Sequence, residues 1–272
     1  MKTQVNVKLL FVFLAVAAMS CKNNSKSGSN AFDNLTDRLV DKQEAVEEVI
    51  GYPIPTSYEV TTMLNDAGAP YIIGINNPTD NVKKYLTTKD RAINLGIYGA
   101  DLSYASTYNL KQETRDYLHV SQELIDELQI ESAFNHDFAK KVEENLENKD
   151  SLISIITDSF YDTYSYLRKN KQDVTSVLIV AGSWIESVYI TSQIIITSND
   201  KEPFITILEN QKNSLEQLLE VLEPVKEDMS VADIYAKLKE MEKIYEGFES
   251  PVATEQINVL TTQIEELRGS LV

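Results

Sequence analysis

The sequence predicts an all-α protein, an antiparallel multi-helix bundle in which amphipathic helices surround a buried central helix. Nine glycines and seven prolines are few for 272 residues, and this scarcity favours long helices over a sandwich of many short strands. Apolar residues return every three or four positions along most of the chain, the spacing that places them on one face of a helix. An apolar content of 43% is enough for a substantial core.

Amphipathic helices are clearest in the second half of the chain. Ser230 and Asp233 predict a capping box at the start of one helix, and Asp150 predicts the N-cap of another. Further helices follow Pro203 and Pro251. The predicted helical ranges are 32–50, 56–66, 79–87, 88–108, 110–129, 135–147, 151–170, 177–196, 204–222, 230–248 and 257–271.

One run resembles a strand, "YIIGI" at 71–75. A lone strand has no partner for its backbone hydrogen bonds. We therefore expect an extended, buried connector here.

The segment 177–196 has the length of a membrane span, and it holds Glu186 near its middle. A carboxylate at the centre of a bilayer is costly unless it is paired, whereas a helix that is apolar on most faces suits the centre of a bundle. We therefore predict the central helix of the bundle here, with a second membrane span as the alternative.

The N-terminus has the features of a signal peptide. Lys2 and Lys8 precede an apolar stretch over 9–18, which is too short to cross a bilayer. The sequence "AMSC" then ends at Cys21, the chain's single cysteine, and a polar tract "KNNSKSGSN" follows. This arrangement resembles bacterial lipoprotein precursors, with Ala18 where the lipobox usually has Leu.

The resemblance implies that the signal is cleaved before Cys21 and that Cys21 carries the lipid, including palmitate-type acyl chains. Two or more chains anchor a protein stably. Ordinary secretion with a free thiol is the alternative. We expect a signal peptide over 1–20, a flexible tether over 21–30 and one helical domain over 31–272. The absence of Asp after Cys21 and of an acidic cluster in the tether implies, by this resemblance, the outer membrane, facing the periplasm.

The net charge of −17 shapes the expected partners. An acidic surface repels phosphate backbones, so nucleic acid is not an expected partner. The expected partners are the membrane, through the lipid, and an envelope protein or a small molecule.

The stretch 91–109 is rich in small and aromatic residues. On a helix its stripe of small side chains consists of Gly96, Gly99, Ser103 and Ser106. Glycine inside a helix costs about 1 kcal/mol relative to alanine, so the stripe indicates either close approach of another helix or room for a ligand.

The pocket hypothesis names five residues: Tyr98, Asp101, Tyr108, Trp184 and Glu186. In it, tyrosine hydroxyls and Asp101 orient a ligand against Trp184 and Glu186 of the central helix.

Glu186 also allows a structural interpretation. A buried glutamate can pair with a buried arginine, and the candidates considered are Arg91, Arg115 and Arg168. No cofactor besides the covalent lipid is expected.

An enzyme is the second hypothesis. His119 lies on the same predicted helix face as Asp116 and Glu123, so a hydrolase or metalloenzyme that uses carboxylates and His119 is the alternative. The chain has no complete Glu-x-x-His pair of the kind that di-iron bundles need, and no nucleophile or phosphate-loop motif.

Two segments, "YPIPTSYEVTTMLNDAGAPYIIGINNPTDN" and "NLGIYGADLSYASTYN", resemble predicted helical lipoproteins of Bacteroidetes-type bacteria. The sequence as a whole predicts a lipid-anchored envelope protein with a non-catalytic binding or structural role.

Overall fold

The computed structural model describes residues 56–133 and 137–272, and within these ranges the protein is an all-α helical bundle without strands. Its helices are α2 (Ser57–Asp66), α3 (Thr88–Thr107), α4 (Lys111–Leu128), α5 (Phe138–Glu144), α6 (Lys149–Lys169), α7 (Asp173–Thr197), α8 (Glu202–Leu222), α9 (Ala232–Glu246) and α10 (Thr254–Gly269), with short 3-10 turns η1 (Thr79–Lys84), η2 (Glu131–Ala133) and η3 (Glu223–Val225). The predicted fold class is confirmed. Helix 32–50 and Cys21 lie outside the described residues.

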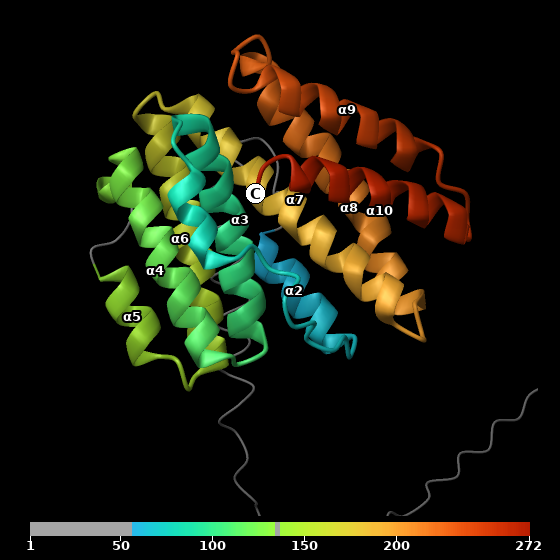
Figure 1. Ribbon diagram of the computed structural model, residues 1–272, viewed down its shortest axis with the longest axis horizontal. Coiled ribbons are helices and arrows are strands. Elements are labelled where there is room, and N and C mark those ends of the chain that lie inside the picture. Colours follow the sequence, from blue (N-terminus) through green and yellow to red (C-terminus); the bar gives the residue numbers. More distant parts are fainter. Residues whose placement is uncertain (1–55, 134–136) are drawn as a thin grey trace, which may run out of the picture.

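The helices form two groups that meet along α3 and α7 (Figure 1). Helices α3, α4, α5 and α6 stand side by side in one group, and α7, α8, α9 and α10 run obliquely to them in the other, with α2 between. The most extensive helix-helix contact is that between α3 and α7. Buried residues of both groups belong to one hydrophobic cluster.

Helix α7 is the central helix, as predicted. It contacts α2, α3, α6, α8 and α10, and almost every residue from Ser176 to Ile195 is buried. In the part of the chain that is described, it is also the one helix long and apolar enough to cross a membrane, and 83% of its most apolar window is buried inside the protein. Burial on all sides explains an apolar sequence without amphipathic periodicity.

Side-chain caps fix the start of the helices that lead into the core. Thr56 caps α2 and Thr87 caps α3, each paired with an acidic residue three positions on in a capping box. Two predicted caps were wrong. Helix α6 begins at Lys149 with Asn148 as its N-cap, in place of Asp150. The N-cap of α9 is Val231, which has no capping side chain, and the Ser230 N–H donates to the Asp228 carboxylate at 2.8 Å.

The segment 71–75 is a connector without strand pairing, but it is neither extended nor fully buried. It turns at Gly74, where φ is +83°, and Ile73 is 87% exposed. Tyr71, Ile72 and Ile75 pack against the core. The backbone finds partners on helices, since Ile72 N–H donates to the Tyr104 hydroxyl at 2.9 Å. Side chains of neighbouring helices therefore replace strand pairing.

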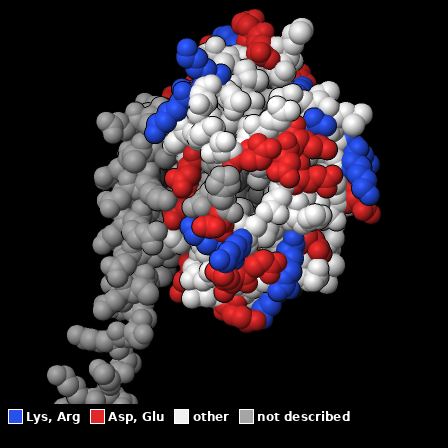
Figure 2. Space-filling view, turned by 90° about the vertical axis from the view of Figure 1, so that its left-hand side faces the viewer, with Lys and Arg blue, Asp and Glu red and all other residues white. Residues whose placement is uncertain are grey.

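The surface of the α4–α6 group carries more acidic than basic side chains (Figure 2). Some acidic residues are paired across helices, for example Glu143 of α5 with Arg115 of α4 at 3.0 Å. Such exposed pairs contribute little to stability, and the face remains one that repels polyanions.

Candidate functional site

Two glycines bring α3 and α7 into close contact. A Cβ atom added at Gly96 would lie 2.0 Å from the Ile179 carbonyl oxygen, and one at Gly182 would lie 2.0 Å from the Ile93 carbonyl oxygen. Neither helix can carry a larger residue at these positions without moving apart. Gly96, the first glycine of the predicted small-residue stripe, is therefore a packing residue.

One turn further along α3 the same stripe meets open space. A Cβ added at Gly99 would have no atom within 4 Å, and Gly99 lines a cavity of about 70 Å³ between α2, α3, α4, α5, α6 and α7. Ser103, the next residue of the stripe, lines the same cavity. Close approach of α7 thus explains the glycine at position 96, which also borders the cavity, and open space surrounds a Cβ at position 99.

Residues whose buried hydroxyls lack partners line this cavity. Ser121 of α4 and Thr157, Ser159 and Tyr164 of α6 are between 1% and 8% exposed, and the hydroxyl of each lacks a hydrogen-bond partner among the residues that the structure describes. Burying a hydroxyl without a partner costs free energy. The hydroxyl of Tyr58, which also lines the cavity, is a fifth such group. Five such groups around one cavity are the feature of the molecule that most requires an explanation.

The hydroxyls of α6 without partners differ in their hydrogen bonding from another hydroxyl of the same helix, that of Thr163. A helical Ser or Thr can donate to the carbonyl four residues before it, and Thr163 does so to Ser159 at 2.7 Å. Thr157 and Ser159 make no such bond. Burial raises the pKa of Tyr164 to about 12, so its phenol stays neutral. These groups are uncharged and free to donate and accept hydrogen bonds.

The rest of the cavity wall is apolar. Of the described residues that line the cavity, none is charged. Its apolar lining comprises Leu95, Leu102, Ile125, Phe138, Ile156, Phe160, Leu167, Ile179 and Val180, with the Tyr58 ring. A mostly apolar cavity with a few polar groups is typical of small-molecule sites.

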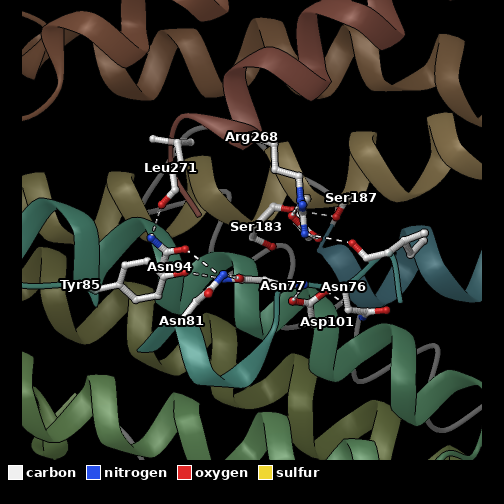
Figure 3. A network of polar contacts seen from close by, with 12 residues as sticks. Asn76, Asn77, Asn81, Tyr85, Asn94, Asp101, Ser183, Ser187, Arg268 and Leu271 are labelled. Carbon is white, nitrogen blue, oxygen red and sulfur yellow. Dashed lines mark hydrogen bonds and ion pairs between the residues drawn. The ribbon is translucent and has the colours of Figure 1, made fainter. Parts of the chain in front are cut away.

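A second polar region lies at the junction of α3, α7 and α10 (Figure 3). Arg268 of α10 binds Glu186 of α7 with two hydrogen bonds, Nε to Oε2 at 2.6 Å and Nη2 to Oε1 at 2.9 Å. Its Nη2 also donates to the Ile75 carbonyl at 3.1 Å, and its guanidinium lies 4.1 Å from the centre of the Tyr189 ring. This bidentate geometry is the strongest form of ion pair.

Asp101 of α3 completes a buried triad with this ion pair. It accepts hydrogen bonds from Asn76 Nδ2 at 2.8 Å and from Asn77 N–H at 3.1 Å. Burial, followed by the charge of Glu186, raises the pKa of Asp101 well above its usual range. Burial also raises the pKa of Glu186, against the effects of Arg268 and of a hydrogen bond with Asp101. One proton on the two carboxyl groups makes the triad neutral.

Asn77 links this triad to the C-terminus. Its Nδ2 donates to the Tyr85 hydroxyl at 2.8 Å and to Asn94 Oδ1 at 3.3 Å. Asn94 in turn donates to the Leu271 carbonyl at 2.9 Å. We call Asn76, Asn77, Asn94, Asp101, Glu186 and Arg268 the buried network. All of its side chains have hydrogen-bond partners.

The five residues of the pocket hypothesis do not line the 70 Å³ cavity. Tyr98 donates to the Pro78 carbonyl at 2.9 Å and Tyr108 to the Ala69 carbonyl at 2.8 Å, so both hold the 69–78 segment on α3. Asp101 and Glu186 are brought together in the buried network. Trp184 is 3% exposed, and its indole nitrogen lacks a partner within the described ranges.

Glu186 does form a buried ion pair with an arginine, as the structural interpretation predicted, but not with any of the three arginines considered. Arg91 pairs with Glu127, Arg115 with Glu143 and Arg168 with Asp173, all nearer the surface. The partner is Arg268, 82 residues away in sequence.

Sequence reasoning missed Arg268 and the free hydroxyls. Arg268 lies four residues after Ile264, on the buried face of α10, and a charged residue on an apolar stripe is a signal that could have found it. Ser159 and Thr163 lie on the apolar face of α6, so their burial could be expected from the sequence. Nothing in the sequence distinguishes a hydroxyl without a partner, such as that of Ser159, from one with a partner, such as that of Thr163.

The enzyme hypothesis gains no geometric support. Asp101 and Glu186 are 0% exposed, His119 is an exposed residue of α4, and neither carboxylate lines the cavity. Residues 56–133 and 137–272 contain no group of three side chains able to hold a metal ion. His136 lies outside the described residues.

No protein-family model matches this chain, and neither the curated proteins nor the solved structures contain a significant match. The function is therefore inferred from the site.

Proposed function

We propose that this protein is a lipid-anchored, non-catalytic binding protein of the cell envelope, whose helical domain holds a small molecule in the hydroxyl-lined cavity. The observation that carries the proposal is the set of unpartnered, buried hydroxyls around that cavity. A ligand that hydrogen-bonds to them would remove the free-energy cost of their burial.

The buried network supports a binding role over catalysis. Catalytic acids and bases must reach a substrate, and the acidic pair Asp101 and Glu186 is enclosed and paired. Its role in the proposal is to join α3, α7, α10 and the 69–78 segment into a rigid frame for the cavity. An envelope protein docked on a helix face is the second partner considered, and the acidic surface does not favour nucleic acid.

The anchor part of the proposal rests on the sequence around Cys21 and its resemblance to lipoprotein precursors. Acyl chains on Cys21 would hold the domain at the outer membrane, facing the periplasm, with 22–30 as the tether.

Binding is tested by native mass spectrometry of the full chain purified from a bacterial envelope. We expect a co-purifying small molecule on the wild type, and its loss from a Gly99→Leu variant, whose side chain would fill the cavity. Val259→Leu is the control, because Val259 is 45% exposed on α10. A ligand retained equally by both variants would place it elsewhere and contradict the proposal.

The anchor is tested separately by intact mass and membrane fractionation beside Cys21→Ser. We expect the wild type to begin at Cys21, to carry acyl mass and to sediment with membranes. A variant that remains membrane-bound without acyl mass would refute the anchor and leave the cavity proposal intact.

A further inference from the structure

The lining of the cavity restricts the chemistry of its ligand, and this inference rests on the proposed function. We infer that the ligand is an uncharged amphiphile, with an apolar body and an alcohol or amide group that meets the hydroxyls of α4 and α6. The restriction follows from charge, from hydrogen-bonding capacity and from size.

Charge is the first criterion. None of the described lining residues is ionisable at neutral pH, since the polar ones are Ser, Thr and Tyr and burial raises the pKa of Tyr164 to about 12. The buried arginine Arg268 is already held by Glu186. A carboxylate or ammonium group in the cavity would lose its hydration and find no counter-charge.

Hydrogen-bonding capacity is the second criterion. A hydroxyl both donates and accepts, so Thr157, Ser159 and Tyr164 on α6 and Ser121 on α4 match a ligand group that does the same. Alcohols and amides have this property, whereas an ether or a hydrocarbon does not. A purely apolar ligand would leave these hydroxyls and that of Tyr58 without partners.

Size is the third criterion. The cavity volume of about 70 Å³ is about half of the 150 Å³ at which an apolar cavity binds benzene. By this comparison it encloses a group of about three heavy atoms. Gly99 is only half-buried, so the remainder of a longer molecule can extend past α3.

The test is a methyl NMR titration of the full chain carrying Cys21→Ser, with 1-butanol, butyrate and butylammonium as probes of equal chain length. Ile125, Ile156 and Ile179 line the cavity and report binding, and Ile264 of α10 is the remote control. We expect saturable shifts of the lining methyls with butanol, at a Kd at least tenfold lower than for either ion.

Variants then locate the contacts. Gly99→Leu should abolish the butanol-dependent shifts, and Ser159→Leu, which fills the cavity from α6, provides the same test if the first variant does not fold. Thr157→Val with Ser159→Ala should weaken butanol severalfold and leave the ions unchanged. Val259→Leu should behave as the wild type.

The possible failures are distinguishable. Butyrate or butylammonium that shifts the lining methyls at the same Kd as butanol would overturn the ligand class while the proposed function stands. Absence of saturable shifts with every probe would overturn the inference, and if native mass spectrometry also finds no ligand, the proposed function fails with it.

Discussion

The buried network and the cavity are both polar regions next to α3 and α7, and they differ in how their polar groups are satisfied. In the network, Asp101, Glu186 and Arg268 have partners at hydrogen-bond distance. Around the cavity, hydroxyls such as Thr157 and Ser159 are equally buried but unpartnered. A polar group satisfied by the fold stabilises the fold, whereas one left free is available for a ligand.

The largest effect should come from breaking the network at its cation. Arg268→Met leaves Glu186 buried without a counter-charge, and removal of one partner of a buried pair typically costs about 3–5 kcal/mol. Chemical denaturation of the variant would measure this loss. Adding Glu186→Gln should restore part of the stability. A variant within about 1 kcal/mol of the wild type would contradict the assignment of this ion pair as structural.

The close contact between α3 and α7 gives the next largest effect. In Gly182→Ala the new methyl group would meet the Ile93 carbonyl oxygen at 2.0 Å, so the helices must separate. Overpacking of this kind costs about 1–3 kcal/mol, and we expect a lower free energy of unfolding. A neutral or stabilising result would show that the interface tolerates a larger separation.

The proton of the triad predicts a pH dependence. The pKa of Asp101 is raised in the folded protein, so the folded state binds more protons than the unfolded state above the ordinary Asp pKa. Stability contributed by this group is therefore full at lower pH and is lost as the pH rises through the folded pKa. Tyr98 and Tyr117 nearby have raised pKa values and remain neutral.

Asp101→Asn keeps the side chain neutral at all pH values. We expect this variant to lose the decline in stability that begins above the ordinary Asp pKa, and denaturation curves recorded across a pH series give the difference between it and the wild type. The subtraction removes the contribution of the other acidic groups. Equal pH slopes for the two proteins would show that Asp101 does not hold the proton.

The smallest expected change in the free energy of unfolding is an increase, unlike the decreases above. Gly99→Ala places a methyl group in open space and removes the unfavourable helix propensity of glycine, a gain of up to about 1 kcal/mol. Gly96→Ala, three residues earlier on α3, is the matched control and should be destabilising. Thermal and chemical unfolding of both variants compare the two ends of one stripe. A destabilised Gly99→Ala would mean that the cavity is smaller than described.

The sequence by itself determined the helices and the central position of α7. Helix formation depends on local spacing and caps, which explains why the predicted ranges 88–108 and 110–129 agree with α3 and α4 within a residue or two. The segment 79–87 formed only a 3-10 turn over Thr79–Lys84. The residue before it is held on α3 by the hydrogen bond from Tyr98 to the Pro78 carbonyl, a tertiary contact that the local sequence does not show.

Only the tertiary structure decided which small residues pack and which leave space. Gly96 and Gly99 are equivalent in sequence, and they differ because α7 passes directly over Gly96, whereas no neighbouring element in the described ranges lies within 4 Å of a Cβ at Gly99. The tertiary structure also decided that Glu186 pairs with Arg268 and with no other arginine of the described residues, because this pairing depends on how α10 lies against α7. Contacts between residues 82 positions apart leave no local pattern in the chain, whereas a helix is encoded within each turn.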